Sequence, residues 1–278
     1  MKCFYHTDMD GKCAGAIVKK MFGRGEYRPI NYKDEFPFGE IEKNEDVVIV
    51  DFSLQGDGDF ERLLEITERV VWIDHHKTAI EKHAHLEGRI DGIRRDGISG
   101  CELAWEYFYQ NRPVPQVVRL LGDYDIWAFN YGDDTEHLQS GIRLYSTDAE
   151  SLNWNRWLSP DYEPKEEIEA GRIATKYRDS YYAGLVKEWS FRTTFEGHPA
   201  IACNACSVSS QLFDTADGEF DLMIPFAFDG GQWTISLYTT KEGVDVSEIA
   251  KKYGGGGHNQ AAGFQCEELP FKREEVNA

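Results

Sequence analysis

Acidic and histidine side chains recur in the first 150 residues wherever a predicted strand ends. In chain order these residues are His6, Asp8, Asp10, Asp51, Asp74, His75 and His76. Two carboxylates about 4 Å apart repel by about 4 kcal/mol at an effective dielectric constant near 20, so a converging set must bind protons or cations. Carboxylates and imidazoles without thiolates suit Mn²⁺ or Mg²⁺, and a pair of such ions serves in phosphoester hydrolysis.

The elements that would bring these residues together alternate between strands and helices. Strands are predicted at residues 2–6, 46–52 and 69–74. Helices are predicted at residues 11–22, at 60–67 and after Ser99, which would cap a helix with Glu102 at its third position. The last two strands are almost continuously apolar, which is typical of a parallel sheet covered on both faces. Ligands bind at the carboxyl ends of the strands in such α/β sheets, so one sheet edge should gather the acidic and histidine residues.

The length of 278 residues favours two domains. We predict an α/β domain at residues 1–155, a linker helix region at 156–187 and a smaller α/β domain at 188–278. The last region contains several strand-like segments and a hairpin turn at Asp229-Gly230-Gly231.

Four consecutive glycines, Gly254 to Gly257, stand before His258 near the end of the chain. Glycines are tolerated where the backbone needs positive φ or a close approach, and their N–H groups can then face a phosphate. A short helix starting at Ala261 would point its N-terminus at the same anion. We therefore predict that Gly255, Gly256, Gly257 and His258 bind substrate, whereas a flexible surface loop is the alternative.

The formal net charge is −19. A surface this negative repels long polyanions and anionic membranes, so we expect neither long nucleic acid nor a membrane as a partner. No apolar stretch of the sequence approaches the roughly 18 to 20 residues of a membrane span, and the N-terminus lacks the pattern of a signal peptide. The expected location is the cytoplasm.

Taken together, these motifs resemble the DHH phosphoesterase superfamily. The resemblance lies in the segments His6-Thr7-Asp8-Met9-Asp10-Gly11, Asp74-His75-His76 and Gly254 to Gly263, and in Asp51. The glycine segment is similar to the motif of the DHHA1 domain. The entry motif and the segment Asp123-Tyr124-Asp125-Ile126-Trp127 resemble the nanoRNase B-like branch, which includes oligoribonucleases and cyclic-nucleotide phosphodiesterases. The resemblance implies a parallel-sheet DHH domain, a smaller DHHA1 domain and an active site in the cleft between them.

The resemblance also implies roles for single residues. Two Mn²⁺ ions are expected, with Mg²⁺ as the alternative: His6 and Asp8 on one ion, Asp10 and His75 on the other, and Asp51 bridging with the acid of a fourth motif. We favour Asp123 over Asp125 as that acid because Asp123 follows the small residue Gly122. Asp74 would orient or ligate from the strand end, and His76 would face the scissile phosphate.

The activity that follows is metal-dependent hydrolysis of very short oligonucleotides or small nucleotides to mononucleotides. The alternatives are hydrolysis of pyrophosphate, polyphosphate or a 3′,5′-bisphosphate nucleotide, and a non-catalytic nucleotide-sensing module. Tyr124, Trp127 and Tyr238 could stack on a base, although most aromatic residues of the chain should belong to its core. A homodimer is a possible assembly.

Overall fold

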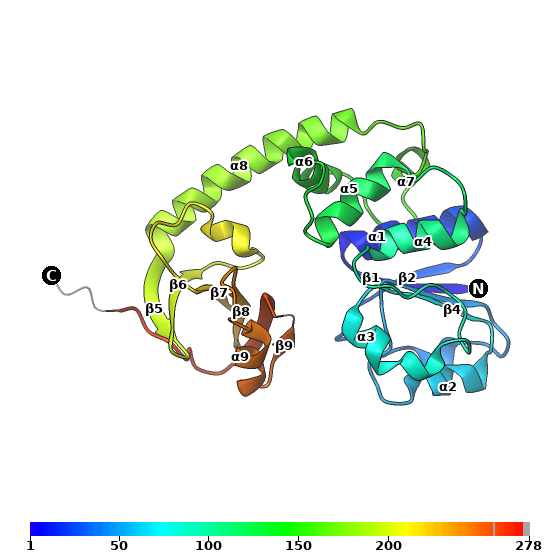
Figure 1. Ribbon diagram of the computed structural model, residues 1–278, viewed down its shortest axis with the longest axis horizontal. Helices are drawn as coiled ribbons and strands as arrows, with labels where there is room; N and C mark the ends of the chain where they lie inside the picture. Colours follow the sequence, from blue (N-terminus) through cyan, green and yellow to red (C-terminus); the bar gives the residue numbers. More distant parts are fainter. Residues whose placement is uncertain (258, 275–278) are drawn as a thin grey trace. The chain divides into compact units, whose positions relative to one another are not determined.

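The computed structural model describes residues 1–257 and 259–274, and it divides into two compact units (Figure 1). The first unit is Met1–Thr175 and the second is Lys176–Ala278. Each unit has its own sheet and its own hydrophobic core, so each is described by itself.

The first unit is built on a four-stranded sheet with the order β2-β1-β3-β4. The strands are β1 (Lys2–His6), β2 (Glu26–Ile30), β3 (Val47–Val50) and β4 (Val70–Ile73). All three strand pairs are parallel. The helices α1 (Met9–Phe22) and α2 (Asp59–Ile66) lie between successive strands in the chain, as parallel pairing requires. The predicted α/β class is confirmed.

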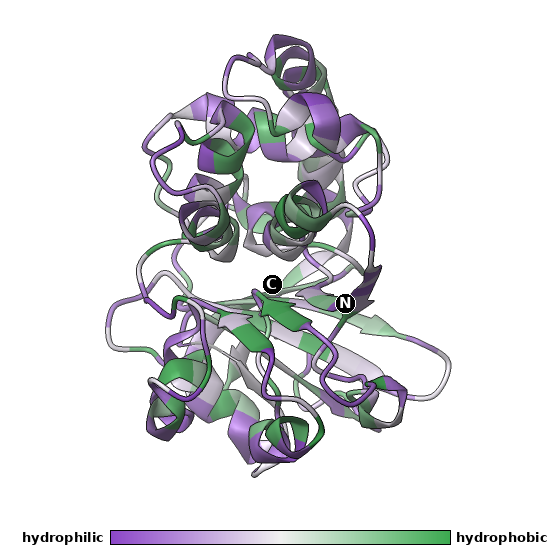
Figure 2. Cartoon of the chain, turned by 90° about the vertical axis from the view of Figure 1, so that its right-hand side faces the viewer, coloured by the Kyte–Doolittle hydropathy of each residue, from purple (hydrophilic) through white to green (hydrophobic). Residues whose placement is uncertain are grey.

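Helices cover both faces of this sheet (Figure 2). Side chains of the strands alternate between the two cores on either side. Cys3 and Tyr5 point into a core shared with α1, whereas Phe4 points into the opposite core with α2. Trp72 is fully buried in the second core and donates from its indole N–H to the carbonyl of Phe52 at 3.0 Å. The near-continuous apolar character of β3 follows from this double coverage.

Further helices complete the first unit. They are α3 (Lys77–Lys82), α4 (Gly100–Phe108), α5 (Gln116–Asp125), α6 (Asp133–Ile142) and α7 (Asn153–Trp157), with short 3₁₀ turns at Phe38–Glu40 and Ala84–Leu86. Ser99 caps α4 as predicted, because its hydroxyl accepts a hydrogen bond from the backbone N–H of Glu102 at 3.3 Å. The cap fixes where α4 begins, and that point lies beside the acidic cluster described below.

The second unit contains a six-stranded sheet with the order β5-β6-β7-β8-β10-β9. Its strands are β5 (Ser190–Phe195), β6 (His198–Asn204), β7 (Leu222–Phe228), β8 (Trp233–Tyr238), β9 (Gly256–Gly257) and β10 (Ala261–Cys266). A 3₁₀ turn (Ser210–Phe213) and the helix α9 (Val246–Lys252) pack with it. The predicted hairpin turn at Asp229 joins β7 to β8, where its N–H donates to the carbonyl of Gln232.

The predicted helix at Ala261 is wrong. Residues Ala261–Cys266 form β10, whose backbone pairs antiparallel with β8 from Ala261 opposite Tyr238 to Cys266 opposite Trp233. A long ladder with a neighbouring strand satisfies the backbone groups that a short helix would otherwise have satisfied, so tertiary pairing outweighs the helix preference of two alanines.

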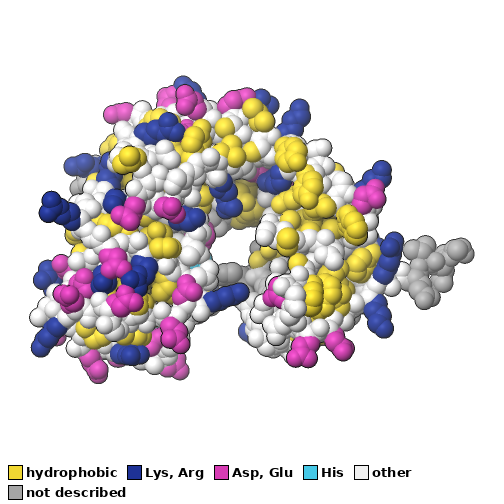
Figure 3. Space-filling view, turned by 180° about the vertical axis from the view of Figure 1, so that it is seen from behind, with side chains coloured by type: hydrophobic (Ala, Val, Ile, Leu, Met, Phe, Trp, Pro, Cys, Tyr) yellow, Lys and Arg dark blue, Asp and Glu magenta, His cyan; other side chains and the backbone are white. Residues whose placement is uncertain are grey.

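The helix α8 (Lys165–Trp189) contains the boundary between the two units, within the region predicted as a linker helix. None of the described helices combines the length and apolar character needed to cross a bilayer. On the face shown in Figure 3, Lys and Arg side chains lie among Asp and Glu side chains. Ion pairs occur among the described residues, as between Arg95 and Glu106 at 2.6 Å.

Candidate functional site

Strand register brings three chemically active residues to one edge of the first sheet. Tyr5 of β1 pairs with Val50 of β3, and Val50 pairs with Ile73 of β4. The next residues along these strands are His6, Asp51 and Asp74. Because the strands are parallel, all three lie at the carboxyl edge, as in other open α/β sheets.

Two helix N-termini approach the same edge through glycines. A Cβ on Gly11 of α1 would lie 2.3 Å from the carbonyl oxygen of His6, and a Cβ on Gly100 of α4 would lie 2.8 Å from a carboxylate oxygen of Asp10. Only glycine permits these approaches. As a result, Asp10 accepts hydrogen bonds from the N–H groups of Gly100 at 2.7 Å and Cys101 at 3.0 Å, which hold its carboxylate against the N-terminus of α4.

The ring of His75 lies among three carboxylates. Its Nε2 atom is 3.1 Å from Asp51 Oδ1, 3.4 Å from Asp125 Oδ2 and 4.0 Å from Asp10 Oδ2. Burial lowers the pKa of His75 and, together with the nearby His76, outweighs the charge of Asp10, so the imidazole is neutral at neutral pH. A neutral imidazole is the form that ligates metals.

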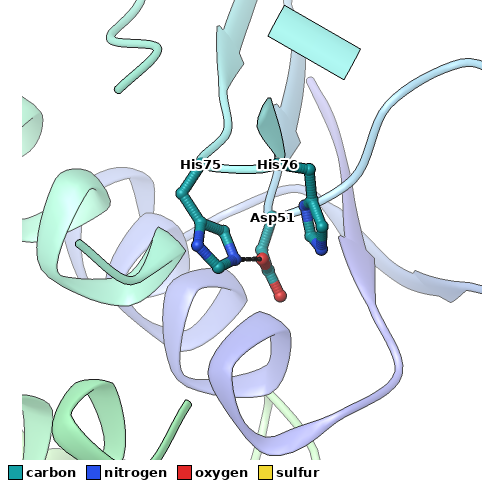
Figure 4. A group of neighbouring side chains, drawn as sticks. All are labelled: Asp51, His75 and His76. Carbon is teal, nitrogen blue, oxygen red and sulfur yellow. Dashed lines mark ion pairs between the residues drawn. The ribbon is translucent and has the colours of Figure 1, made fainter. Parts of the chain in front are cut away.

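A second group lies on the other side of Asp51. Nδ1 of His6 is 2.7 Å from Asp8 Oδ2 and 3.9 Å from Asp51 Oδ2. Ligand atoms of His6, Asp8 and Asp51 lie within 4.8 Å of one another, as do those of Asp10, His75 and Asp125 and those of Asp51, His75 and His76. In Figure 4 the two imidazoles of His75 and His76 flank the Asp51 carboxylate. Asp51 thus stands between two groups of potential metal ligands.

The carboxylate of Asp51 is short of partners for a buried anion. The residue is 1% exposed, and among the described residues neither of its oxygens has a hydrogen-bond partner. Burial and the charges of Asp10 and Asp8 raise its pKa well above the ordinary value. A buried carboxylate without donors, next to two imidazoles and other carboxylates, fits divalent cations as the missing partners.

The structure places Asp125, and not the predicted ligand Asp123, beside His75. The carboxylate of Asp123 accepts hydrogen bonds from the N–H and the side-chain amide of Asn130, at 3.0 and 2.9 Å, and from Thr135 Oγ1 at 2.5 Å. Burial raises its pKa, but these hydrogen bonds outweigh burial and lower it overall. Asp125 instead belongs to the group around His75, and burial with the charges of Asp10 and Asp8 raises its pKa to about 9.

Asp74 holds the two histidines that follow it. Its buried Oδ1 accepts hydrogen bonds from the N–H of His75 at 2.8 Å, from the N–H of His76 at 3.2 Å and from Nδ1 of His76 at 2.7 Å. Burial lowers the pKa of His76, but the hydrogen bond and charge of Asp74 raise it overall. Asp74 therefore orients His76 and favours its protonated form.

Tyr32 belongs to this site and was missed in the sequence. Its ring centroid lies 5.1 Å from that of His6, 6.2 Å from that of His76 and 5.0 Å from that of Phe52, against which it stacks. Tyr32 follows β2, which pairs with β1 up to Ile30 opposite His6. The available signal was the short segment Glu26–Ile30, but it mixes charged with apolar residues, and Pro29 argues against a strand within a sheet. The proline is accommodated because β2 is an edge strand.

The predicted phosphate-binding glycines belong to the second unit. Gly256 and Gly257 form β9 against β10, and Gly255 lies where a Cβ would be 2.1 Å from the carbonyl oxygen of Gly263. Close backbone approach thus explains part of the glycine run. His258 lies outside the described residues. Phosphate binding by Gly255, Gly256, Gly257 and His258 stays a prediction.

Comparison with known proteins adds an independent observation. A family model described as the DHHA1 domain matches residues 209–278. The oligoribonuclease NrnB of Bacillus subtilis (strain 168) is 27% identical over 291 residues, an alignment that covers 94% of this chain and 71% of NrnB. The DHHA1 match and the similarity to NrnB support the resemblance to the DHH/DHHA1 phosphoesterase superfamily.

Two further similar proteins differ from this chain more in length or in sequence identity. An uncharacterized protein of Acanthamoeba polyphaga mimivirus is 24% identical to this chain over 250 residues, covering 83% of this chain but 56% of the viral protein. This chain therefore spans little more than half the length of that relative. The structure of the pGpG-specific phosphodiesterase PggH from Vibrio cholerae covers 96% of this chain and 93% of its own, with 13% identity and a TM-score of 0.57. That likeness shows a shared fold.

The raised pKa values of Asp51 and Asp125 predict that the stability of the protein depends on metal. In the unfolded chain, Asp51 and Asp125 release their protons near pH 3.8. In the metal-free folded protein their pKa values are raised, so they keep these protons to higher pH. The stability contributed by these bound protons is therefore complete at low pH. It is lost as the pH rises toward the pKa of each group in the folded protein, which is about 9 for Asp125. Raising the pH from about 6 to about 8 should lower the Tm of the metal-free protein, and saturating Mn²⁺ should raise it, by more at the higher pH.

This prediction is checked by following unfolding through tryptophan fluorescence, with and without EDTA. Trp72, Trp105 and Trp157 are buried in the first unit and report on its unfolding. A Tm that does not change on addition of Mn²⁺ at either pH value would contradict a cation site at Asp51.

Proposed function

We propose that this protein is a metal-dependent phosphodiesterase that hydrolyses very short oligonucleotides or small nucleotides to mononucleotides. The observation that carries the proposal is the Asp51 carboxylate, which is buried without a hydrogen-bond partner among the described residues. It groups with His6 and Asp8 on one side and lies 3.1 Å from Nε2 of His75 on the other. The name of the relative NrnB, an oligoribonuclease, and that of PggH, a pGpG-specific phosphodiesterase, support this class of substrate.

The residues that would hold the cations follow from the two groups. His6, Asp8 and Asp51 form one group, and Asp10, His75 and Asp125 form the other. Oxygen and imidazole ligands without thiolates suit Mn²⁺ or Mg²⁺. When bound, two divalent ions would neutralise the carboxylates, polarise the phosphoryl oxygens and activate a water for attack on phosphorus.

His76 contributes a proton and a positive charge from the chain itself. Asp74 accepts from Nδ1 of His76, so Nδ1 carries a proton and the ring is held in one orientation. The raised pKa of His76 keeps a fraction of the ring protonated near neutral pH. We propose that this imidazole donates to a phosphoryl oxygen, where charge accumulates in the transition state.

The alternatives are less well supported by the surroundings of the site. An enzyme for phosphoanhydrides needs several Lys or Arg side chains around the phosphates, but Lys77 points its charge toward Glu81 at 4.0 Å and is 68% exposed. A nucleotide sensor without catalysis has no need for a shared buried carboxylate of this kind.

A panel of substrates tests the proposal. We expect protein with Mn²⁺ to release mononucleotides from a labelled dinucleotide faster than from a long oligonucleotide, and to turn over pyrophosphate, cyclic AMP and a 3′,5′-bisphosphate nucleotide more slowly. EDTA should abolish the reaction, and added Mn²⁺ should restore it. Faster turnover of pyrophosphate would support the phosphoanhydride alternative, and a bound nucleotide that survives incubation with Mn²⁺ would support the sensor.

A further inference from the structure

The loop that follows α5 has an aromatic residue where helices usually place glycine. The N–H of Trp127 donates to the carbonyl of Tyr124 at 3.0 Å, and the N–H of Ala128 donates to the carbonyl of Asp123 at 3.0 Å. These two bonds define a Schellman motif with Trp127 at the left-handed position. Its φ of 56° is costly for a residue with a Cβ, by about 1 to 2 kcal/mol.

A second aromatic residue of the loop shares this backbone conformation. Phe129 has a φ of 50°. The ring centroids of Trp127 and Phe129 lie 4.8 Å apart at 90°, and the ring of Tyr124 lies 5.2 Å from Trp127 and 5.8 Å from Phe129. The three rings support one another edge to face and hold Trp127 in place.

Burial does not offset the backbone cost at Trp127. Its side chain is 54% exposed, and its neighbours Ile126 and Tyr131 are 37% and 49% exposed. Tyr238, the other aromatic residue considered for base stacking, packs instead against the apolar cluster around Cys203 and Phe213. Left-handed backbone at bulky residues, without a gain from burial, is typical of functional sites.

The loop begins at the candidate metal centre. Asp125, the last residue of α5, has its Oδ2 3.4 Å from His75 Nε2. Consecutive Cα atoms are about 3.8 Å apart, so the Cα of Trp127 lies within about 7.6 Å of that of Asp125. The far end of the loop is held by the Asp123 carboxylate, which accepts hydrogen bonds from Asn130 and Thr135. The exposed indole thus belongs to a loop that is anchored at a carboxylate of the candidate centre.

We propose that the indole of Trp127 is a stacking surface for a nucleobase of the substrate, and that it gives the centre a preference for base-bearing phosphodiesters over phosphates without a base. This inference rests on the proposed phosphodiesterase function and names its specificity residue. An uncharged ring among exposed apolar neighbours fits the neutral face of a base better than a phosphate, and stacking of this kind contributes about 1 to 3 kcal/mol per base.

The test separates the ring from the backbone. Trp127→Gly removes the indole and supplies the residue that the Schellman motif prefers, so its Tm should equal or exceed that of the wild type. Its kcat/KM for a dinucleotide should fall roughly tenfold or more, through KM, relative to its kcat/KM for the same dinucleotide with abasic sugars. Trp127→Phe should retain most of the preference, and Trp189→Ala, which removes a 63% exposed tryptophan of α8, serves as the matched control.

The outcomes distinguish this inference from the proposed function. If the wild type and Trp127→Gly show the same ratio for the two substrates, or if only Tm falls, the stacking role is overturned. If the wild type cleaves neither substrate, the proposed function fails, and binding then decides the inference. In that case dinucleotide binding measured by calorimetry should still weaken in Trp127→Gly and not in Trp189→Ala, and equal binding would overturn it.

Discussion

Asp51→Asn is expected to lower turnover of a dinucleotide by roughly a thousandfold or more, about 4 kcal/mol of transition-state stabilisation. Asp51 belongs to the group with His6 and Asp8, and its Oδ1 lies 3.1 Å from Nε2 of His75 in the other group, so its loss should weaken both. An amide keeps the shape of the side chain but cannot carry the negative charge that attracts a divalent ion. The effect should appear both in kcat and in the concentration of Mn²⁺ needed for half-maximal activity.

The same variant should fold as well as the wild type. Asp51 has a φ of 53°, a conformation that asparagine adopts more readily than most residues, so asparagine avoids the strain that alanine would introduce. Removal of a buried carboxylate that faces Asp10 and Asp8 relieves repulsion, so the Tm of the metal-free variant should match or exceed that of the metal-free wild type.

A matched control is Asp57→Asn, because the side chain of Asp57 is 98% exposed and lies outside both ligand groups. It should leave turnover, Mn²⁺ dependence and Tm unchanged. Turnover of Asp51→Asn within about tenfold of the wild type would contradict the role given to this carboxylate.

Asparagine at Asp125 and at Asp123 should have opposite effects. Asp125→Asn is expected to weaken Mn²⁺ binding and reduce turnover by roughly a hundredfold or more, while the Tm of the metal-free protein stays constant or rises. The reason is that burial and the charges of Asp10 and Asp8 already disfavour an ionised Asp125.

Asp123→Asn should instead destabilise the first unit and leave Mn²⁺ affinity intact. The charged carboxylate accepts from Asn130 and Thr135, and the amide of an asparagine would turn a donor toward one of these donors. Loss of charge-assisted hydrogen bonds costs about 1.5 to 3 kcal/mol, which corresponds to a fall in Tm of several degrees.

Calorimetric Mn²⁺ titrations and thermal unfolding of the metal-free proteins separate the two variants. Weakened Mn²⁺ binding in Asp123→Asn together with normal binding in Asp125→Asn would restore Asp123 as the ligand. Unchanged Mn²⁺ binding in both variants would show that neither Asp123 nor Asp125 belongs to the metal centre.

The first sheet shows how much local pattern can predict. The continuous apolar runs of β3 and β4 are unambiguous because both faces of those strands are buried, and the residues after them were predicted to meet on that basis. β2 carried a weaker signal because Pro29 interrupts it, and its place at the sheet edge cannot be seen locally. Tyr32 was therefore missed together with its strand.

The types of residue in the centre, and the kind of ion and chemistry that suit them, follow from the sequence, because ligand preference and strand polarity are local properties. The sequence does not show which of two carboxylates, two residues apart, faces His75. Asp123 and Asp125 lie in the same last turn of α5, and their roles are separated by what the turn packs against: Asn130 and Thr135 on one side, Asp10 and His75 on the other. Those partners are distant in the chain or beyond a left-handed turn at Trp127, so only the tertiary structure decides between them.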